Sequence, residues 1–146
     1  MVNNSKAITD HYATGGLAER ILAALTDSGV DMNSLSYEDL APLDQFHVRG
    51  RDATIELANT AEISSKRRII DVGGGIGGPA RTIAAQFGCD VTVVDLTEEY
   101  CRAGEILTTR TGLQDRVHFT NASALDIPFD DSSFDLAWQQ HSSMNI

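Results

Sequence analysis

The eleven residues from Ile69 to Pro79 constrain the fold of this chain more than any other stretch. A short β-branched run ends at Val72, glycine fills five of the next six positions, and Pro79 begins a helical pattern. This order predicts a buried strand, a tight turn and a helix N-terminus. Glycines let a ligand approach the backbone, and the free N–H groups of a helix N-terminus favour polar or anionic ligand groups. The stretch therefore predicts a nucleotide-binding turn, although a plain strand-to-helix connection can have the same form.

The glycines alone do not determine which nucleotide is bound. The spacing Gly73-x-Gly75-x-x-Gly78 also satisfies the dinucleotide fingerprint, and Asp95 lies twenty residues after Gly75, where a ribose-binding acid is expected. An NAD(P)-binding oxidoreductase is therefore one alternative at this point.

Strand and helix periods alternate along the rest of the chain. Apolar residues at helical spacing predict helices over 6–28 and 51–63, and Ser36 as N-cap predicts a short helix that Pro42 ends. Strands are expected over 68–72, 91–94, 116–120 and 133–138, with helices over 79–87 and 97–110 between the first three. Strands separated by helices pair in parallel, so the fold class is α/β.

Composition narrows the function classes. A net charge of −10 argues against a nucleic-acid-binding surface, which needs clustered Lys and Arg. No apolar run is long enough for a membrane span, and the first residues lack the apolar core of a signal peptide. Cys89 and Cys101 form no C-x-x-C motif, which favours free thiols in a reducing cytoplasm. Histidine and cysteine spacing indicates no metal site.

Two further motifs indicate which family the glycine turn belongs to. Asp71 stands two residues before Gly73, and the block Ile127-Pro128-Phe129-Asp130-Asp131-Ser132-Ser133-Phe134-Asp135 precedes the last strand. With these features the chain resembles the class I S-adenosylmethionine-dependent methyltransferases. It is most similar to the small-molecule group that includes the ubiquinone/menaquinone, sterol and glycine/sarcosine enzymes, which carry a segment like Pro42-Leu43-Asp44-Gln45-Phe46-His47 in a helical cap.

The resemblance implies an architecture. It is a Rossmann-like parallel sheet with strand order 3-2-1-4, preceded by an N-terminal helical cap over residues 1–64 and formed by a cofactor-binding part over residues 65–146. The resemblance also implies three further strands, so we expect residues 65–146 to be the incomplete, N-terminal part of the cofactor domain. The fourth strand would then present an unpaired edge through which two copies can associate.

The resemblance also implies roles for individual residues around S-adenosylmethionine and its product S-adenosylhomocysteine. Asp71 would hold the amino group of the methionyl part, and Gly73, Gly75 and Gly77 would lie against the methionyl part and the ribose. Asp95 would accept both ribose hydroxyls, while Leu96 would pack on the adenine.

The third family motif departs from its usual form. Ser123 replaces the acid that accepts a hydrogen bond from the adenine amino group, and the Ala124 N–H remains available. Because a hydroxyl accepts without charge assistance, we expect adenine anchoring to weaken by about 1 kcal/mol.

Ligands of such sheets lie beyond the carboxyl ends of the strands. The last strand therefore predicts Gln139, Gln140 and His141 near the methionyl end. Gln140 and His141 are the catalytic candidates, with His141 as the candidate general base. His47 is expected either to pack within the cap or to cover the sulfonium. The expected activity is methyl transfer to a small-molecule acceptor. A non-catalytic cofactor-binding module is the other alternative, since the acceptor pocket would require more chain.

Overall fold

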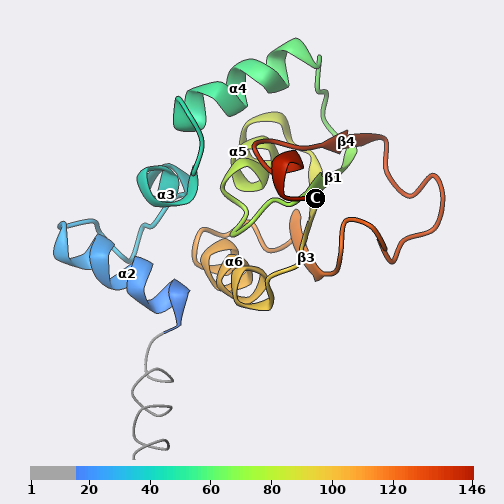
Figure 1. Cartoon of the computed structure of the whole chain (residues 1–146). Helices are drawn as coiled ribbons and strands as arrows, with labels where there is room; N and C mark the ends of the chain where they lie inside the picture. The colour runs from blue at the N-terminus through green and yellow to red at the C-terminus, as the bar shows by residue number, and fades with distance from the viewer. Residues whose placement is uncertain (1–15) are drawn as a thin grey trace, which may run out of the picture.

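The computed structural model of the protein describes residues 16–146 as a four-stranded parallel sheet with helices packed around it (Figure 1). In chain order the elements are α2 (Leu17–Asp27), α3 (Tyr37–Asp44), α4 (Gly50–Thr60), β1 (Arg68–Val72), α5 (Gly78–Phe87), β2 (Asp90–Asp95), α6 (Glu98–Arg110), β3 (Val117–Asn121), β4 (Leu136–Trp138) and the 3-10 helix η1 (Ser143–Asn145). The strand order is β3-β2-β1-β4, which confirms the predicted order and the α/β class.

The two central strands place the acids of the sequence motifs. β1 pairs with β2 on one side and with β4 on the other, and Asp71 is opposite Val93 and Trp138. The main core gathers apolar side chains of β1, β2 and α5, together with Trp138, all buried. Burial on both faces explains why apolar residues stand side by side in these strands, at Ile69 and Ile70 and at Val93 and Val94, rather than at every second position. The carboxyl ends of β1 and β2 carry Asp71 and Asp95 to one edge of the sheet.

The cap helices lie outside the helices that follow the strands. α3 and α4 pack against α5, and α2 packs against α6, so the cap reaches the sheet through these helices (Figure 1). The N-terminus of α3 forms a capping box: Asp39 N–H donates to the Ser36 hydroxyl, and Ser36 N–H donates to the Asp39 carboxylate. The predicted N-cap is therefore confirmed.

Several predicted boundaries differ from the structure. Pro42 does not end α3, which continues to Asp44. The proline removes one helical hydrogen bond, and the burial of Leu40 and Asp44 offsets that loss. The predicted helix over 6–28 is seen from Leu17 onward, and residues 6–15 lie outside the described part of the chain.

The fourth strand is shorter than predicted. It covers Leu136–Trp138 instead of 133–138, because Ser133 is held in a turn in which its N–H and its hydroxyl both donate to the Asp130 carbonyl. Among the described strands β4 pairs only with β1, so its other edge has no partner strand. Self-association through this edge stays a prediction.

The glycine run also joins the cap to the sheet. A Cβ at Gly78 would overlap the backbone carbonyl of Asp44, the last residue of α3. Only glycine therefore lets the end of α3 rest on the first turn of α5.

Replacing Gly78 by alanine is expected to lower the free energy of unfolding by about 1–3 kcal/mol, because the added methyl group forces α3 away from α5. Urea unfolding followed by circular dichroism measures this. Ala85→Gln, at an exposed position of the same helix, is the control and should change stability by less than about 0.5 kcal/mol. Equal effects of the two substitutions would contradict the close contact.

Candidate functional site

Asp95 organises the turn that follows β1. Its Oδ2 accepts a hydrogen bond from Gly75 N–H at 2.9 Å, and its Oδ1 accepts one from Thr97 N–H at 2.9 Å. Thr97 holds the N-cap position of α6, and its side chain makes no capping hydrogen bond to a described residue. Each carboxylate oxygen has lone pairs to spare, so Asp95 can accept further hydrogen bonds from a ligand diol.

Asp71 is the most unusual charged residue of the site. It is 1% exposed, and its Oδ2 has no hydrogen-bond partner among the described residues. Burial, followed by the negative charge of Asp95, raises the pKa of Asp71 to about 7. A buried carboxyl group with a free oxygen calls for a cationic donor, because an unpaired polar group is costly in the interior.

The glycines of the turn divide into two kinds. A Cβ at Gly74 would clash with the Asp71 carboxylate, and one at Gly77 would clash with the Phe119 ring. A Cβ at Gly75, in contrast, would meet no atom within 4 Å, although the φ of 58° strains any other residue there. Gly75 is therefore the position where the backbone is open to a ligand.

The larger of two cavities at this edge has a volume of about 600 Å³, within the usual range for small-molecule sites. It brings together residues from the ends of β1, β2 and β3. Its lining includes Gly73, Gly75, Asp95, Leu96, Tyr100, Ser123, Ala124 and Leu125. Leu96 and Leu125 are 75% and 84% exposed, so two large apolar side chains stand at its rim without packing partners of their own.

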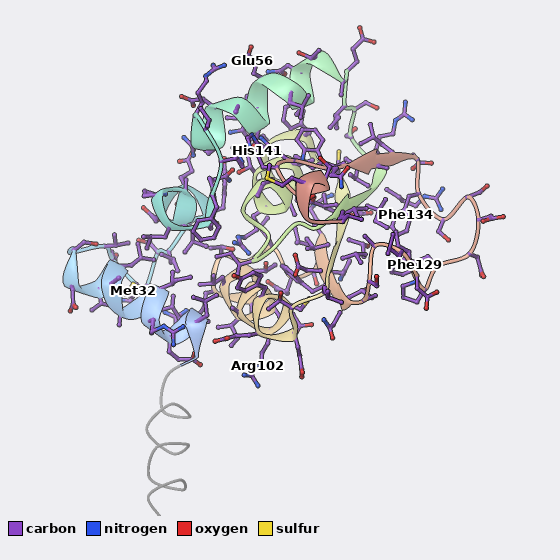
Figure 2. The ribbon with its side chains drawn as sticks, in the orientation of Figure 1. Met32, Glu56, Arg102, Phe129, Phe134 and His141 are labelled. Atoms are coloured by element: carbon purple, nitrogen blue, oxygen red, sulfur yellow. The ribbon has the colours of Figure 1, made fainter. Side chains whose placement is uncertain are left out.

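A smaller cavity of about 110 Å³ lies beside it and contains Asp71. Both cavities share the lining residues Phe46, Gly73, Gly75 and His141, so they form one connected cleft over the glycine turn. The smaller cavity is closed by residues of the cap and of the segment after β4. In Figure 2, His141 lies beneath α4, whereas Phe129 and Phe134 lie together on the loop before β4, away from it.

Most predicted site residues line this cleft. Two of them do not, and a third lines it but already uses its side chain in a hydrogen bond. Gln139 is exposed and lines neither cavity, because successive side chains at the end of a strand point to opposite sides and its neighbours Trp138 and Gln140 take the inner side. Gly77 lines neither cavity and is held against Phe119. The Ser123 hydroxyl already accepts a hydrogen bond from Leu125 N–H at 3.1 Å, so it stabilises its own turn.

A polar cluster between the cap and the last segment was not predicted. Thr54 of α4 is fully buried, and its hydroxyl lies 3.1 Å from Gln45 Oε1, 3.3 Å from His47 Nε2 and 3.1 Å from Gln140 Oε1. The His47 and His141 rings stack with centroids 5.6 Å apart. Burial lowers the pKa of His47, and the neighbouring His141 lowers it further, against opposing contributions from the Val48 carbonyl and Asp44. Thr54 carried no sequence signal, because its partners are up to 86 positions away.

A buried ion pair fixes the cap above the cleft. Arg81 Nη2 donates to Asp44 Oδ2 at 2.8 Å, and both side chains are essentially without exposure. Arg81 Nη1 also donates to the Thr108 hydroxyl at 3.0 Å, which ties α5 to α6. Burial raises the pKa of Asp44, while the Arg81 charge opposes that rise. Asp44 thereby sets the position of Phe46 and His47, which follow it into the cleft.

Comparisons with known proteins agree with this geometry. Residues 69–146, more than half of the chain, match the family model described as "Methyltransferase domain". The chain belongs to the methyltransferase family. The resemblance to class I S-adenosylmethionine-dependent methyltransferases is thereby confirmed, and so is S-adenosylmethionine as the cofactor of the family. Neither the dinucleotide alternative nor the non-catalytic alternative gains support.

Individual relatives fall in the small-molecule group. The chain is 32% identical over 119 residues to a glycine/sarcosine/dimethylglycine N-methyltransferase from Actinopolyspora halophila, covering 82% of this chain and 20% of that protein. It is 36% identical over 80 residues to a tocopherol O-methyltransferase from Arabidopsis thaliana, covering 55% of this chain and 23% of that protein.

A solved structure shows the same fold. The geranyl diphosphate methyltransferase structure solved with S-adenosylmethionine superposes with a TM-score of 0.64 at 25% identity, over 85% of this chain and 48% of that one. This methyltransferase chain thus spans half or less of the length of each of these three relatives.

Two other features are absent within residues 16–146. No helix in that range has both the length and the apolar character that crossing a bilayer requires. No three His, Cys, Asp or Glu side chains in the same range gather as the ligands of a metal ion would.

Proposed function

We propose that this chain binds S-adenosylmethionine across the two connected cavities and takes part in methyl transfer to a small-molecule acceptor. The observation that carries the proposal is the convergence of Asp71 and Asp95 on one glycine turn. The first acid has a buried oxygen that no described residue contacts by a hydrogen bond, and the second is held by the turn's own backbone. A sulfonium cofactor with an ammonium group at one end and a ribose diol in the middle suits that pair.

Each cavity suits a different part of the cofactor. The adenosine occupies the larger cavity, where Leu96 and Leu125 cover the adenine, Ala124 N–H reaches its edge and Asp95 accepts from the ribose. The methionyl part occupies the smaller cavity, with its ammonium group donating to Asp71. Gln140 and His141 border the acceptor side. Gly77 and Gln139 have no direct contact in this proposal, and Ser123 supports the adenine turn.

The chemistry asks for positioning more than for covalent help. A bound sulfonium cofactor supplies an activated methyl group, and the protein's task is to hold the acceptor in line with it and to exclude water. Phe46 lines both cavities and covers the junction between them. The buried free thiols of Cys89 and Cys101 support the proposed cytoplasmic location.

Calorimetric titration with S-adenosylhomocysteine and with NADH tests the proposal. We expect saturable binding of S-adenosylhomocysteine and no binding of NADH. Binding of NADH alone would overturn the proposal in favour of an oxidoreductase.

Asp95→Asn is expected to weaken S-adenosylhomocysteine binding by roughly 10- to 100-fold, because a charged acceptor of the ribose hydroxyls is lost. The matched control is Asp90→Asn, which makes the same chemical change at the exposed opposite end of β2. Calorimetry of both variants measures the difference. Similar affinities for the two would remove Asp95 from the cofactor site.

A further inference from the structure

The junction of the two cavities is where the sulfur of a bound cofactor would lie. In S-adenosylmethionine the sulfur joins the adenosine to the methionyl chain, and these two parts suit the larger and the smaller cavity. Four residues line both cavities: Phe46, Gly73, Gly75 and His141. Since the two glycines have no side chain, only Phe46 and His141 can present a side chain to the sulfur.

The carboxylates that line the cavities are engaged away from this junction. Asp71 suits the ammonium group and Asp95 suits the ribose, while Asp44 of the smaller cavity pairs with Arg81 at 2.8 Å. No other carboxylate of residues 16–146 lines either cavity. The sulfonium therefore has no carboxylate of its own here. Because the face of an aromatic ring is electron-rich, such a ring also attracts a cation.

Phe46 has a ring face available at the junction. Its side chain is 77% exposed, and no aromatic ring among residues 16–146 stacks on it. His141, in contrast, already stacks one face of its ring on His47, with the centroids 5.6 Å apart. Phe46 is thus the aromatic group best placed to give a face to the sulfonium.

The backbone on either side of Phe46 is held in place by its neighbours. Gln45 Nε2 donates to the Thr82 hydroxyl of α5 at 3.2 Å, and His47 Nε2 lies 3.3 Å from the Thr54 hydroxyl of α4. These contacts position the ring over the junction before any ligand arrives. A preformed contact of this kind lowers the entropy cost of binding.

We propose that the ring of Phe46 lies against the sulfonium of bound S-adenosylmethionine and raises the affinity of the chain for this cation relative to S-adenosylhomocysteine, whose sulfur is uncharged. This rests on the proposed function. When the methyl group passes to the acceptor, the electron pair of the broken carbon–sulfur bond stays on sulfur, so the positive charge and its attraction to the ring are lost. Phe46 is therefore a specificity-determining residue that distinguishes the cofactor from the product.

Calorimetric titration of the full 146-residue chain with S-adenosylmethionine and with S-adenosylhomocysteine measures both affinities in the absence of an acceptor. Phe46→Leu keeps an apolar side chain but removes the aromatic face. It should weaken binding of S-adenosylmethionine about 3- to 10-fold more than binding of S-adenosylhomocysteine. Phe46→Tyr keeps the aromatic face and should retain the ratio of the two affinities found for the parent chain.

Two further substitutions separate the charge effect from simple covering of the cleft. Phe129→Leu makes the same change on the loop before β4, where the side chain lines neither cavity, and should leave the ratio unchanged (Figure 2). Pentafluorophenylalanine at position 46 keeps the shape and apolar surface of the ring but reverses the charge of its face. It should lower the ratio as Phe46→Leu does, whereas a ring that only excludes water would lose nothing.

NMR of S-adenosylmethionine labelled with ¹³C in its methyl group locates the ring directly. Protons above an aromatic ring are shielded. The methyl resonance in the complex with the parent chain should therefore lie upfield of its position in the complex with the Phe46→Leu variant.

The outcomes separate the two proposals. If neither S-adenosylmethionine nor S-adenosylhomocysteine binds, the proposed function fails and this inference fails with it. If both bind and Phe46→Leu weakens them equally, only the inference is overturned. A methyl resonance at the same position in both complexes would overturn it as well.

Discussion

Replacing Asp71 by asparagine is expected to stabilise the chain above pH 7 while weakening S-adenosylhomocysteine binding by about 100-fold. Stability rises and ligand affinity falls because the same carboxylate destabilises the ligand-free chain and binds the ligand. It is costly in the ligand-free chain, because Oδ2 has no hydrogen-bond partner within residues 16–146, and it becomes the charged acceptor of the ligand's ammonium group.

The stability effect follows from the raised pKa of Asp71. The folded chain keeps the proton up to about pH 7, whereas the unfolded chain releases it near the ordinary value of 3.8. The contribution of the protonated group to stability is therefore complete below pH 3.8 and is lost as the pH rises toward 7. Asparagine does not titrate, so above pH 7 the variant is expected to be more stable by as much as about 4 kcal/mol.

Urea unfolding at pH 5 and pH 8 measures this difference, and calorimetry at the same two values measures binding. Asp135→Asn is the control, since the Arg68 side chain and N–H hold the pKa of Asp135 down to about 2. That substitution should reduce stability above pH 4 and leave binding unchanged. If the Asp71 variant instead loses stability at pH 8, the carboxylate must have a partner in the empty site.

Replacing Arg81 by methionine is expected to lower the free energy of unfolding by about 3–5 kcal/mol, because the Asp44 carboxylate is left buried without its counter-charge. Ligand binding should weaken as well, since Asp44 positions Phe46 and His47 over the cleft. The double variant Arg81→Met, Asp44→Leu should recover much of the stability, because it removes both buried charges.

The measurement is urea unfolding of the parent chain, the Arg81→Met variant and the double variant. Arg51→Met is the matched control, because Arg51 pairs with Glu38 at 2.8 Å on a partly exposed surface, where the loss should be below about 1 kcal/mol. Comparable losses for Arg81→Met and Arg51→Met would show that the buried pair is not the anchor of the cap.

The elements that hold the cofactor were predictable from the sequence because their signals are local. The β-branched run before Gly73, the acids at the ends of two strands and the helix starts all lie within a few residues of one another. Strand order followed from the family motif. From these features the sheet, the order of its strands and the cleft residues from Asp71 to Ala124 could be predicted.

The cap and its contacts were harder to predict because their causes are far apart in the sequence. Arg81 in a helical pattern indicates an exposed position, and only Asp44, 37 residues earlier, explains its burial. The sequence did not distinguish Gly75, which is open, from Gly77 and Gly78, which are packed against other groups. Thr54 had no signal, since its contacts with Gln45 and Gln140 exist only after the cap has folded over the sheet.

The junction between α3 and α5 has a consequence for chimeric enzymes. It consists of a carbonyl resting on Gly78 and a carboxylate held by Arg81, so two positions of α5 specify which caps can dock. A cap transplanted from another methyltransferase would need an acid at the end of the helix that corresponds to α3. The cap can therefore be exchanged as a unit, with the glycine turn left unchanged, only if this pair is kept.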